Sequence, residues 1–238
     1  MRVGVVSAKG SPGATTLALA LAAVSGGLAI ELDPAGGDVE CWSGPQGEPG
    51  LIRVAGATRH AADPAGLLDA HAVEVWPGVR VVLAPTGPET AESTVVAIGE
   101  RLGPALRAHD GWVVVDGGRW SRSQVTARRL VGCDVIAVVV APTLAGVEHA
   151  RWLIDRLTAA FEVPVVGVQV GERPYPPAEV ATALGVQVAG VVAWDQRGVQ
   201  AMVTSGASRS WRRSAVSRSA RSLLDSLERV ASGTVVRG

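Results

Sequence analysis

The sequence is poor in several residue types that mark common classes of protein. Its two cysteines, Cys41 and Cys133, have no second cysteine or histidine nearby at metal-ligand spacing, so neither a zinc site nor a disulfide framework is expected. The apolar runs are no longer than strands, and the run in the N-terminal MRVGVVSAKG is too short for a signal peptide. The 22 basic and 22 acidic residues give a formal net charge of zero, which provides no overall field to attract nucleic acid or membrane. We therefore expect a cytoplasmic protein without a membrane-spanning helix.

Lysine is almost absent, and the position of the single lysine is informative. Lys9 lies in the glycine-rich segment SAKGSPGATT (7–16), between an apolar run (3–6) and a helical pattern (15–24). Backbone N–H groups of such a turn, together with the helix N-terminus behind it, favour an anion. Gly10 and Gly13 allow the backbone to wrap closely, and a lysine reaches phosphate end-on. The segment predicts a phosphate-binding loop; the alternative is a Gly-Pro turn followed by a threonine-capped helix.

Apolar, β-branched runs alternate with helix-length segments along most of the chain. Strands are expected at 3–6, 28–32, 79–84, 112–116, 135–141, 163–170 and 186–193, and helices at 15–24, 89–108, 120–131, 145–161 and 176–184. Near-continuous Val and Ile indicate strands buried on both faces. We predict a three-layer α/β sandwich with a mostly parallel sheet of about seven strands and helices on both faces. Residues 1–232 are expected to form one domain, followed by a short tail (233–238). Residues 42–78 are the least regular stretch.

Two carboxylates follow predicted strands. Asp33 directly follows the strand expected at 28–32, in the segment LAIELDPAGGD (28–38), and Asp116 ends the strand in DGWVVVDGG (110–118). Ligands of parallel sheets bind beyond the carboxyl ends of the strands, so these side chains are expected near the glycine-rich loop. Each motif alone is also compatible with a strand that simply ends in a turn.

Together these motifs resemble those of the MinD/ParA-type ATPases. Their deviant Walker-A loop reads K-G-G-x-G-K-[ST]-[ST]; Lys9, Gly10, Gly13, Thr15 and Thr16 match it, and Ser11 and Pro12 fit loosely. Ala14 departs from the lysine that grips the phosphates. The segment 28–38 resembles D-x-D-P-x-G, with Glu31 in place of the first aspartate, and GVVAWDQ (190–196) is close to G-V-x-P-x-D. The asparagine often found after the preceding strand is absent, since the chain has no asparagine.

The resemblance implies a P-loop fold, ATP and Mg²⁺ as ligands, and a nucleotide-sandwich homodimer. Lys9 and Asp33 would then be catalytic, with Lys9 reaching into the site of a second copy. Thr15, Asp33 and Asp116 would hold the metal. The residues implied in nucleotide binding are Lys9, Gly10, Ser11, Pro12, Gly13, Ala14, Thr15, Thr16, Gly118, Arg173, Trp194 and Asp195.

The resemblance also implies a function. Such proteins use ATP-driven dimerisation to position a partner in partitioning, division, or pilus or secretion systems, and the altered loop favours the pilus and secretion branch. Loss of the lysine at position 14 predicts weaker phosphate binding and slow hydrolysis, because charge in the transition state is less well neutralised. One alternative is a pseudo-ATPase scaffold that keeps the fold and dimer face without turnover. Another is a small-molecule ligase of the same class.

The C-terminal region is rich in arginine. Residues 207–238 contain seven arginines and two acidic residues. One interpretation is a contact with anionic membrane or nucleic acid, with Trp211 as a surface anchor. The other is a final helix that packs its leucines on the sheet while its arginines stay in solvent.

Overall fold

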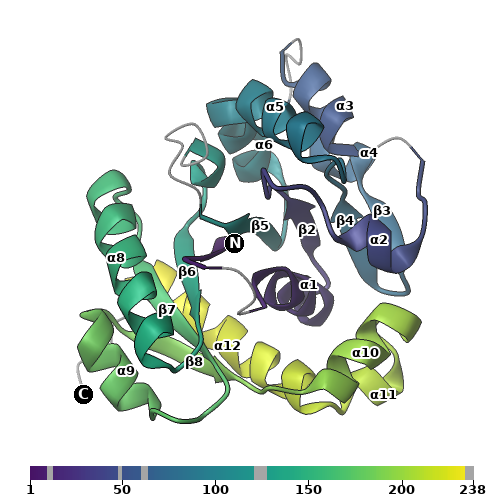
Figure 1. The fold of residues 1–238 in the computed structure, drawn as a ribbon. Helices are drawn as coiled ribbons and strands as arrows, with labels where there is room; N and C mark the ends of the chain where they lie inside the picture. The colour runs from purple at the N-terminus through teal and green to yellow at the C-terminus, as the bar shows by residue number, and fades with distance from the viewer. Residues whose placement is uncertain (10–12, 48–49, 60–63, 121–127, 234–238) are drawn as a thin grey trace.

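The computed structural model describes residues 1–9, 13–47, 50–59, 64–120 and 128–233 and has three layers (Figure 1). A central sheet has the strand order β3-β4-β2-β5-β1-β6-β7-β8. The strands are β1 (Arg2–Ser7), β2 (Leu28–Glu31), β3 (Val73–Trp76), β4 (Val79–Val82), β5 (Val113–Arg119), β6 (Val135–Val140), β7 (Val165–Val170) and β8 (Val188–Val192). The predicted α/β sandwich is confirmed, with eight strands instead of about seven.

All pairs of neighbouring strands are parallel except β3 and β4, which form an antiparallel hairpin at the edge of the sheet. Strand β3 was not predicted from the sequence, because it is only four residues long and has an exposed Glu74 between apolar neighbours. The turn signal was nevertheless present, because Pro77-Gly78 joins the two strands and Gly78 has a φ of 72°.

Helices cover both faces of the sheet. On one face, α1 (Ala14–Ser25), α2 (Val39–Ser43), α10 (Gln196–Ser205), α11 (Arg209–Arg212) and α12 (Ala215–Ala231) enclose one apolar core. On the other face, α3 (Gly50–Ala57), α4 (Leu67–His71), α5 (Pro88–Ile98), α6 (Leu102–Ala108), α8 (Leu144–Ala160) and α9 (Pro177–Leu184) enclose a second. No helix in the described ranges is long and apolar enough to cross a bilayer.

Two predicted helices differ from the structure. The helix expected at 89–108 is divided into α5 and α6 by a 3₁₀ turn (Gly99–Arg101), because Gly99 has a φ of 46° that a regular helix does not accept. Most of the helix expected at 120–131 lies outside the described residues, and 128–130 form a 3₁₀ turn.

The last helix packs as a core element. Leu223, Leu227 and Val230 of α12 are buried in the same apolar cluster as α1 and β8. Trp211 is only 1% exposed, so it is not available as a surface anchor.

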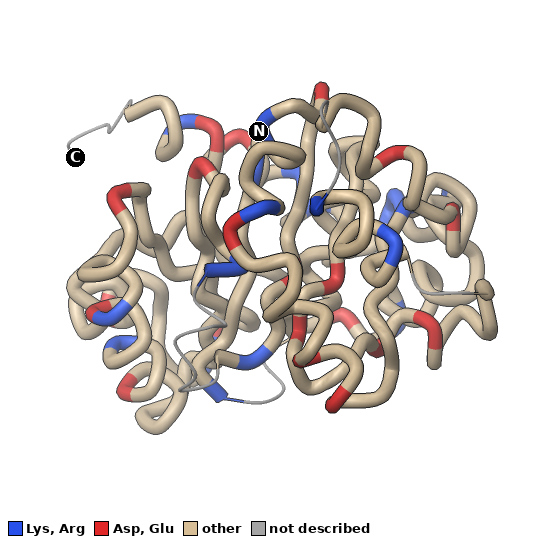
Figure 2. The backbone as a smooth tube through the Cα atoms, turned by 90° about the horizontal axis from the view of Figure 1, so that it is seen from above, with Lys and Arg blue, Asp and Glu red and all other residues tan. Residues whose placement is uncertain are grey.

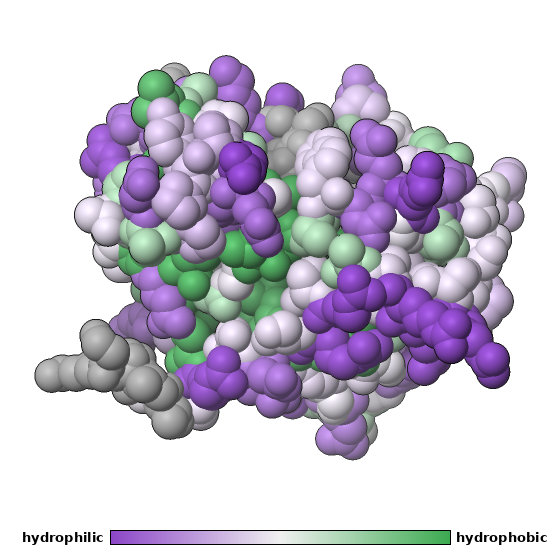
Figure 3. Space-filling model, turned by 90° about the horizontal axis from the view of Figure 1, so that it is seen from below, coloured by the Kyte–Doolittle hydropathy of each residue, from purple (hydrophilic) through white to green (hydrophobic). Residues whose placement is uncertain are grey.

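In the view from below, hydrophilic side chains surround a central apolar hollow (Figure 3). Basic and acidic positions are interspersed along the chain in the view from above (Figure 2).

Candidate functional site

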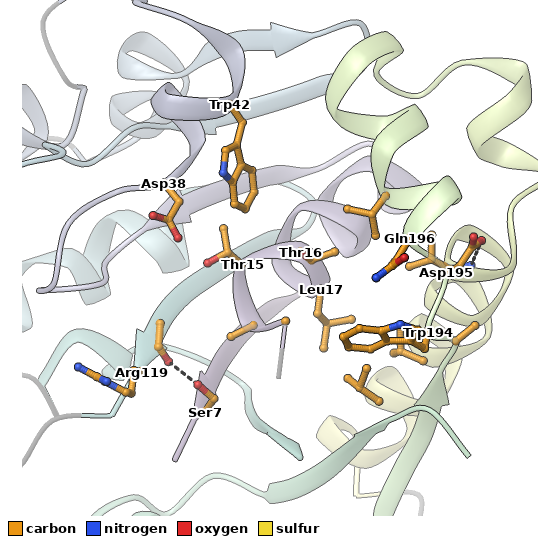
Figure 4. A pocket seen from close by; sticks show the side chains of 18 of the residues that line it. Ser7, Thr15, Thr16, Leu17, Asp38, Trp42, Arg119, Trp194, Asp195 and Gln196 are labelled. Atoms are coloured by element: carbon orange, nitrogen blue, oxygen red, sulfur yellow. Dashed lines mark hydrogen bonds between the residues drawn. The ribbon is translucent and has the colours of Figure 1, made fainter. Parts of the chain in front are cut away.

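A cavity of about 690 Å³ opens at the carboxyl ends of β1, β5 and β8, beside the N-terminus of α1 (Figure 4). Eight residues implicated by the sequence line it: Gly13, Ala14, Thr15, Thr16, Asp33, Gly118, Trp194 and Asp195. Lys9 and Arg173 are exposed and are not among its lining residues. Gly10, Ser11 and Pro12, also predicted here, lie outside the described residues.

The N-terminus of α1 presents backbone N–H groups to the cavity. Gly13, the N-cap, has a φ of 87° in the left-handed region, and no side chain caps the helix. The first turn contains no acidic residue, so its N–H groups and the helix dipole favour an anion. Ala14, at the position of the family's phosphate lysine, is 7% exposed and contributes only a buried methyl group.

Asp116 lies buried in β5, at the carboxyl end of the sheet and beside Thr15 of α1. Its carboxylate accepts hydrogen bonds from the hydroxyl of Thr15 and from the N–H of Gly118, the latter at 3.0 Å. Burial raises the pKa of Asp116 to about 6, against these hydrogen bonds. Among the described residues no three His, Cys, Asp or Glu side chains form a metal cluster. A hydroxyl beside one carboxylate suits Mg²⁺, which keeps several water ligands.

Asp33 joins the loop after β2 to the end of β5. Its Oδ1 accepts a hydrogen bond from the N–H of Ala35 at 2.8 Å, and its Oδ2 accepts one from the N–H of Arg119 at 3.2 Å. Gly118, with a φ of 59°, is pressed against this carboxylate: a Cβ built there would lie 1.8 Å from Asp33 Oδ2. The site therefore requires a glycine at position 118 on two independent grounds, space and backbone conformation.

Glu31 stabilises the loop after β2 through hydrogen bonds from inside the protein. Its Oε1 accepts hydrogen bonds from the N–H groups of Asp38 (2.9 Å) and Val39 (3.0 Å), and its Oε2 accepts one from Ala84 (3.1 Å). Burial raises the pKa of Glu31 to about 7, although these three donors act in the opposite direction. Glu31, which stands where the family motif has an aspartate, thus holds backbone rather than facing the cavity.

Arg129 is a buried cation that the sequence did not reveal. Its Nη2 donates to the carbonyl oxygens of Gly117 (2.7 Å) and Arg119 (3.5 Å), and its guanidinium lies 5.4 Å from the ring centroid of Trp120. Nε and Nη1 have no hydrogen-bond partner among the described residues. Burial lowers the pKa of Arg129 to about 10, and the charges of Asp33 and Asp116 raise it. Arg129 therefore supports the turn at the end of β5 from beneath.

The far wall of the cavity contains Trp194, Gln196 and Gln200. Trp194 is 68% exposed and presents its indole to the cavity (Figure 4). Asp195 is the N-cap of α10: its Oδ1 accepts from the N–H of Gly198 at 2.9 Å, and its Oδ2 accepts from Ala215 at 2.8 Å. These bonds lower the pKa of Asp195. Its carboxylate thus connects two helices beside the cavity.

Several residues that line the cavity were not predicted from the sequence. Ser7 and Arg119 end strands β1 and β5, and Asp38 and Trp42 belong to the segment that leads into and forms α2. The position of Arg119 could have been inferred from the strand that ends at Asp116, because the strand continues for three residues. Asp38 and Trp42 carried no periodic signal, since α2 is only five residues long.

A comparison with family models and a comparison with curated proteins both find no match to the sequence. The fold, by contrast, matches solved structures over nearly the whole chain. A ParA family ATPase from Chlorobium tepidum TLS superposes with a TM-score of 0.74 at 20% identity, covering 95% of this chain and 98% of that one. The septum site-determining protein MinD of Pyrococcus horikoshii OT3, complexed with Mg-ADP, gives 0.75 at 15% identity, covering 99% and 98%. A putative plasmid partition protein from Borrelia burgdorferi B31, bound to AMPPNP, gives 0.66 at 13% identity, covering 96% and 98%.

The arrangement of the sheet and its helices is that of a three-layer α/β protein. Within that class, the chain has the fold of the MinD/ParA ATPases, as its sequence motifs predicted.

Proposed function

We propose that this protein binds ATP with Mg²⁺ in the cavity over α1 and acts as a MinD/ParA-like dimeric switch with slow hydrolysis. The observation that carries the proposal is that Thr15 and Asp33 line a cavity at the open N-terminus of α1, with the buried carboxylate of Asp116 beside Thr15. The cavity volume lies within the range of small-molecule sites.

The residues fit the proposed ligands in three respects. The N–H groups of the first turn of α1 would hold phosphate, Thr15 and Asp116 would hold the hydrated metal, and Trp194 would stack on the base. A bound Mg²⁺ supplies positive charge at the phosphates. Asp33 would orient the attacking water, since its carboxylate is fixed at the cavity wall by two backbone N–H groups.

The function that follows is the ATP-dependent positioning of a partner protein in partitioning, division, or pilus or secretion. We propose a homodimer, one folded domain over 1–232 and a cytoplasmic location. Lys9 is exposed and is not among the residues that line the cavity of its own chain, so its proposed catalytic role is in the site of a second copy. Arg173 would contact the base from the loop after β7. A membrane or nucleic-acid contact through the arginines of 207–238 is a separate proposal.

Binding of AMPPNP with and without Mg²⁺ tests the proposal directly. Calorimetry of the full chain should give a dissociation constant below the millimolar range, tightened by Mg²⁺, and sedimentation should show nucleotide-dependent dimers. Lys9→Ala should bind AMPPNP normally and lose turnover, whereas Arg197→Ala, an exposed change nearby, should keep both. The proposal is wrong if the wild-type chain binds no nucleotide at millimolar concentration.

A second candidate function is a pseudo-ATPase scaffold. The buried methyl of Ala14 supports it, because no lysine is placed to neutralise charge that develops during hydrolysis. Steady-state phosphate release separates the two: a scaffold binds nucleotide and dimerises without releasing phosphate, and Ala14→Lys would leave it inactive.

A further inference from the structure

The side chains that line the cavity carry more negative than positive charge, which disfavours a polyphosphate ligand. Three lining residues, Asp33, Asp38 and Asp195, are carboxylates. Arg119 is the only cationic side chain among the lining residues that the structure describes. Since the position of the usual phosphate lysine holds Ala14, the site needs positive charge from elsewhere.

The backbone of Arg119 is fixed at the end of β5, beside the end of β1. Its N–H donates to Asp33 Oδ2 at 3.2 Å, and its carbonyl oxygen accepts from Arg129 Nη2 at 3.5 Å. In the sheet register Arg119 pairs with Ser7, the last residue of β1, which leads into the loop. Its Cα is therefore held beside the site from two directions.

The side chain of Arg119, in contrast, is exposed and makes no ion pair or hydrogen bond with any described residue. Figure 4 shows it at the rim beside Ser7, with its guanidinium directed away from Thr15. Exposed side chains exchange rotamers within nanoseconds, so a guanidinium on a fixed Cα is free to turn toward an anion. Within the part of the chain that the structure describes, no contact of this side chain would have to be broken.

We propose that Arg119 is the phosphate-binding cation of this site, supplied from the end of β5 in place of a lysine on α1. The inference rests on the proposed nucleotide function and names a residue for it. A guanidinium binds two phosphate oxygens at once, a geometry that a lysine does not reproduce. It would add to the backbone N–H groups of α1 without requiring change in the loop.

The test is calorimetric titration of the full chain with Mg-AMPPNP and, separately, with adenosine. Arg119→Ala should weaken Mg-AMPPNP binding by roughly tenfold to a hundredfold, the usual effect of losing a charge-assisted contact. Its affinity for adenosine should not change, because the base wall is untouched. Arg119→Lys should recover part of the loss, and Arg221→Ala, which removes an equal charge from the exposed side of α12, should bind like the wild type.

A rescue experiment separates charge from structure. Ala14→Lys in the Arg119→Ala background should restore Mg-AMPPNP affinity, because the charge then comes from α1 instead of β5. The inference is wrong if Arg119→Ala binds Mg-AMPPNP as tightly as the wild type, in which case the proposed nucleotide function still stands. It is equally wrong if adenosine binding falls in parallel or if Ala14→Lys restores nothing. If the wild-type chain binds neither ligand, both the inference and the proposed function fall.

Discussion

The carboxylate of Asp33 and the backbone N–H of Arg119 are joined by a 3.2 Å hydrogen bond across 86 positions of sequence. This bond links the loop after β2 to the end of β5, the two segments that would flank a bound terminal phosphate. Glu31 and Arg129 hold the same two segments from within the protein. The loops at the site are thus tied to each other and to the core before any ligand arrives.

The contact between Gly118 and Asp33 predicts that Gly118→Ala strongly destabilises the folded protein. The added methyl would overlap the Asp33 carboxylate at a positive φ of 59°. We expect the free energy of unfolding to fall by about 2–4 kcal/mol, more than the roughly 1 kcal/mol of backbone strain alone. Gly185→Ala is the matched control, because Gly185 has a φ of 70° with open space around it. Urea unfolding measures both, and equal losses would contradict the predicted overlap.

The hydrogen bond between Thr15 and Asp116 predicts that Thr15→Val weakens metal binding selectively. The hydroxyl is lost while the shape of the side chain is kept, so Mg²⁺ should tighten AMPPNP binding much less than in the wild type. We expect the gain on adding Mg²⁺ to shrink by about tenfold, the effect of one lost ligand contact. Thr16→Val, one position along α1, should leave that gain intact. An unchanged Mg²⁺ effect in Thr15→Val would place the metal elsewhere.

Buried Glu31 predicts a pH-dependent stability. Its pKa is raised from 4.5 to about 7, so the folded state binds the proton more tightly than the unfolded state. Its contribution to stability is full below pH 4.5 and is lost as the pH rises through 7. We expect the free energy of unfolding to fall by up to about 3 kcal/mol between pH 5 and pH 8. Glu31→Gln should flatten this decline, whereas Glu179→Gln, an exposed change, should not. If the free energy of unfolding depends on pH in the same way in all three proteins, Glu31 is not the group responsible.

Asp195 accepts hydrogen bonds from two helices, so its removal should lower the free energy of unfolding more than removal of an ordinary helix cap. Asp195→Ala removes the acceptor for the N–H of Gly198 in α10 and for those of Ala215 and Val216 in α12. A single cap contributes about 1 kcal/mol, so we expect about 2 kcal/mol here. Thr143→Ala, which removes the cap of α8 alone, is the control. Thermal unfolding compares them, and an equal decrease in midpoint would mean that α12 does not depend on Asp195.

Some of this site could be predicted from sequence and some could not. Thr15 and Asp33, which line the cavity, and Asp116, which lies buried beside Thr15, were predicted because each follows or ends a strand or opens a helix in a parallel sheet, where the carboxyl ends of strands converge. Arg129 was not, because its place beneath Gly117 depends on how the chain returns after β5. Trp42 was missed for a related reason, since a five-residue helix has too few turns to show a periodic pattern.

Asp195 also has a consequence for communication within the molecule. The Asp195 carboxylate accepts hydrogen bonds from the start of α10, at the rim of the cavity, and from the start of α12, whose other end carries Glu228, close enough to affect the charge of the Met1 amino group. A ligand that displaces the segment around Trp194 would also displace the start of α12, because Asp195 is hydrogen-bonded to both helices. Binding in the cavity would in that way shift α12 along its length without any movement of the strands of the sheet.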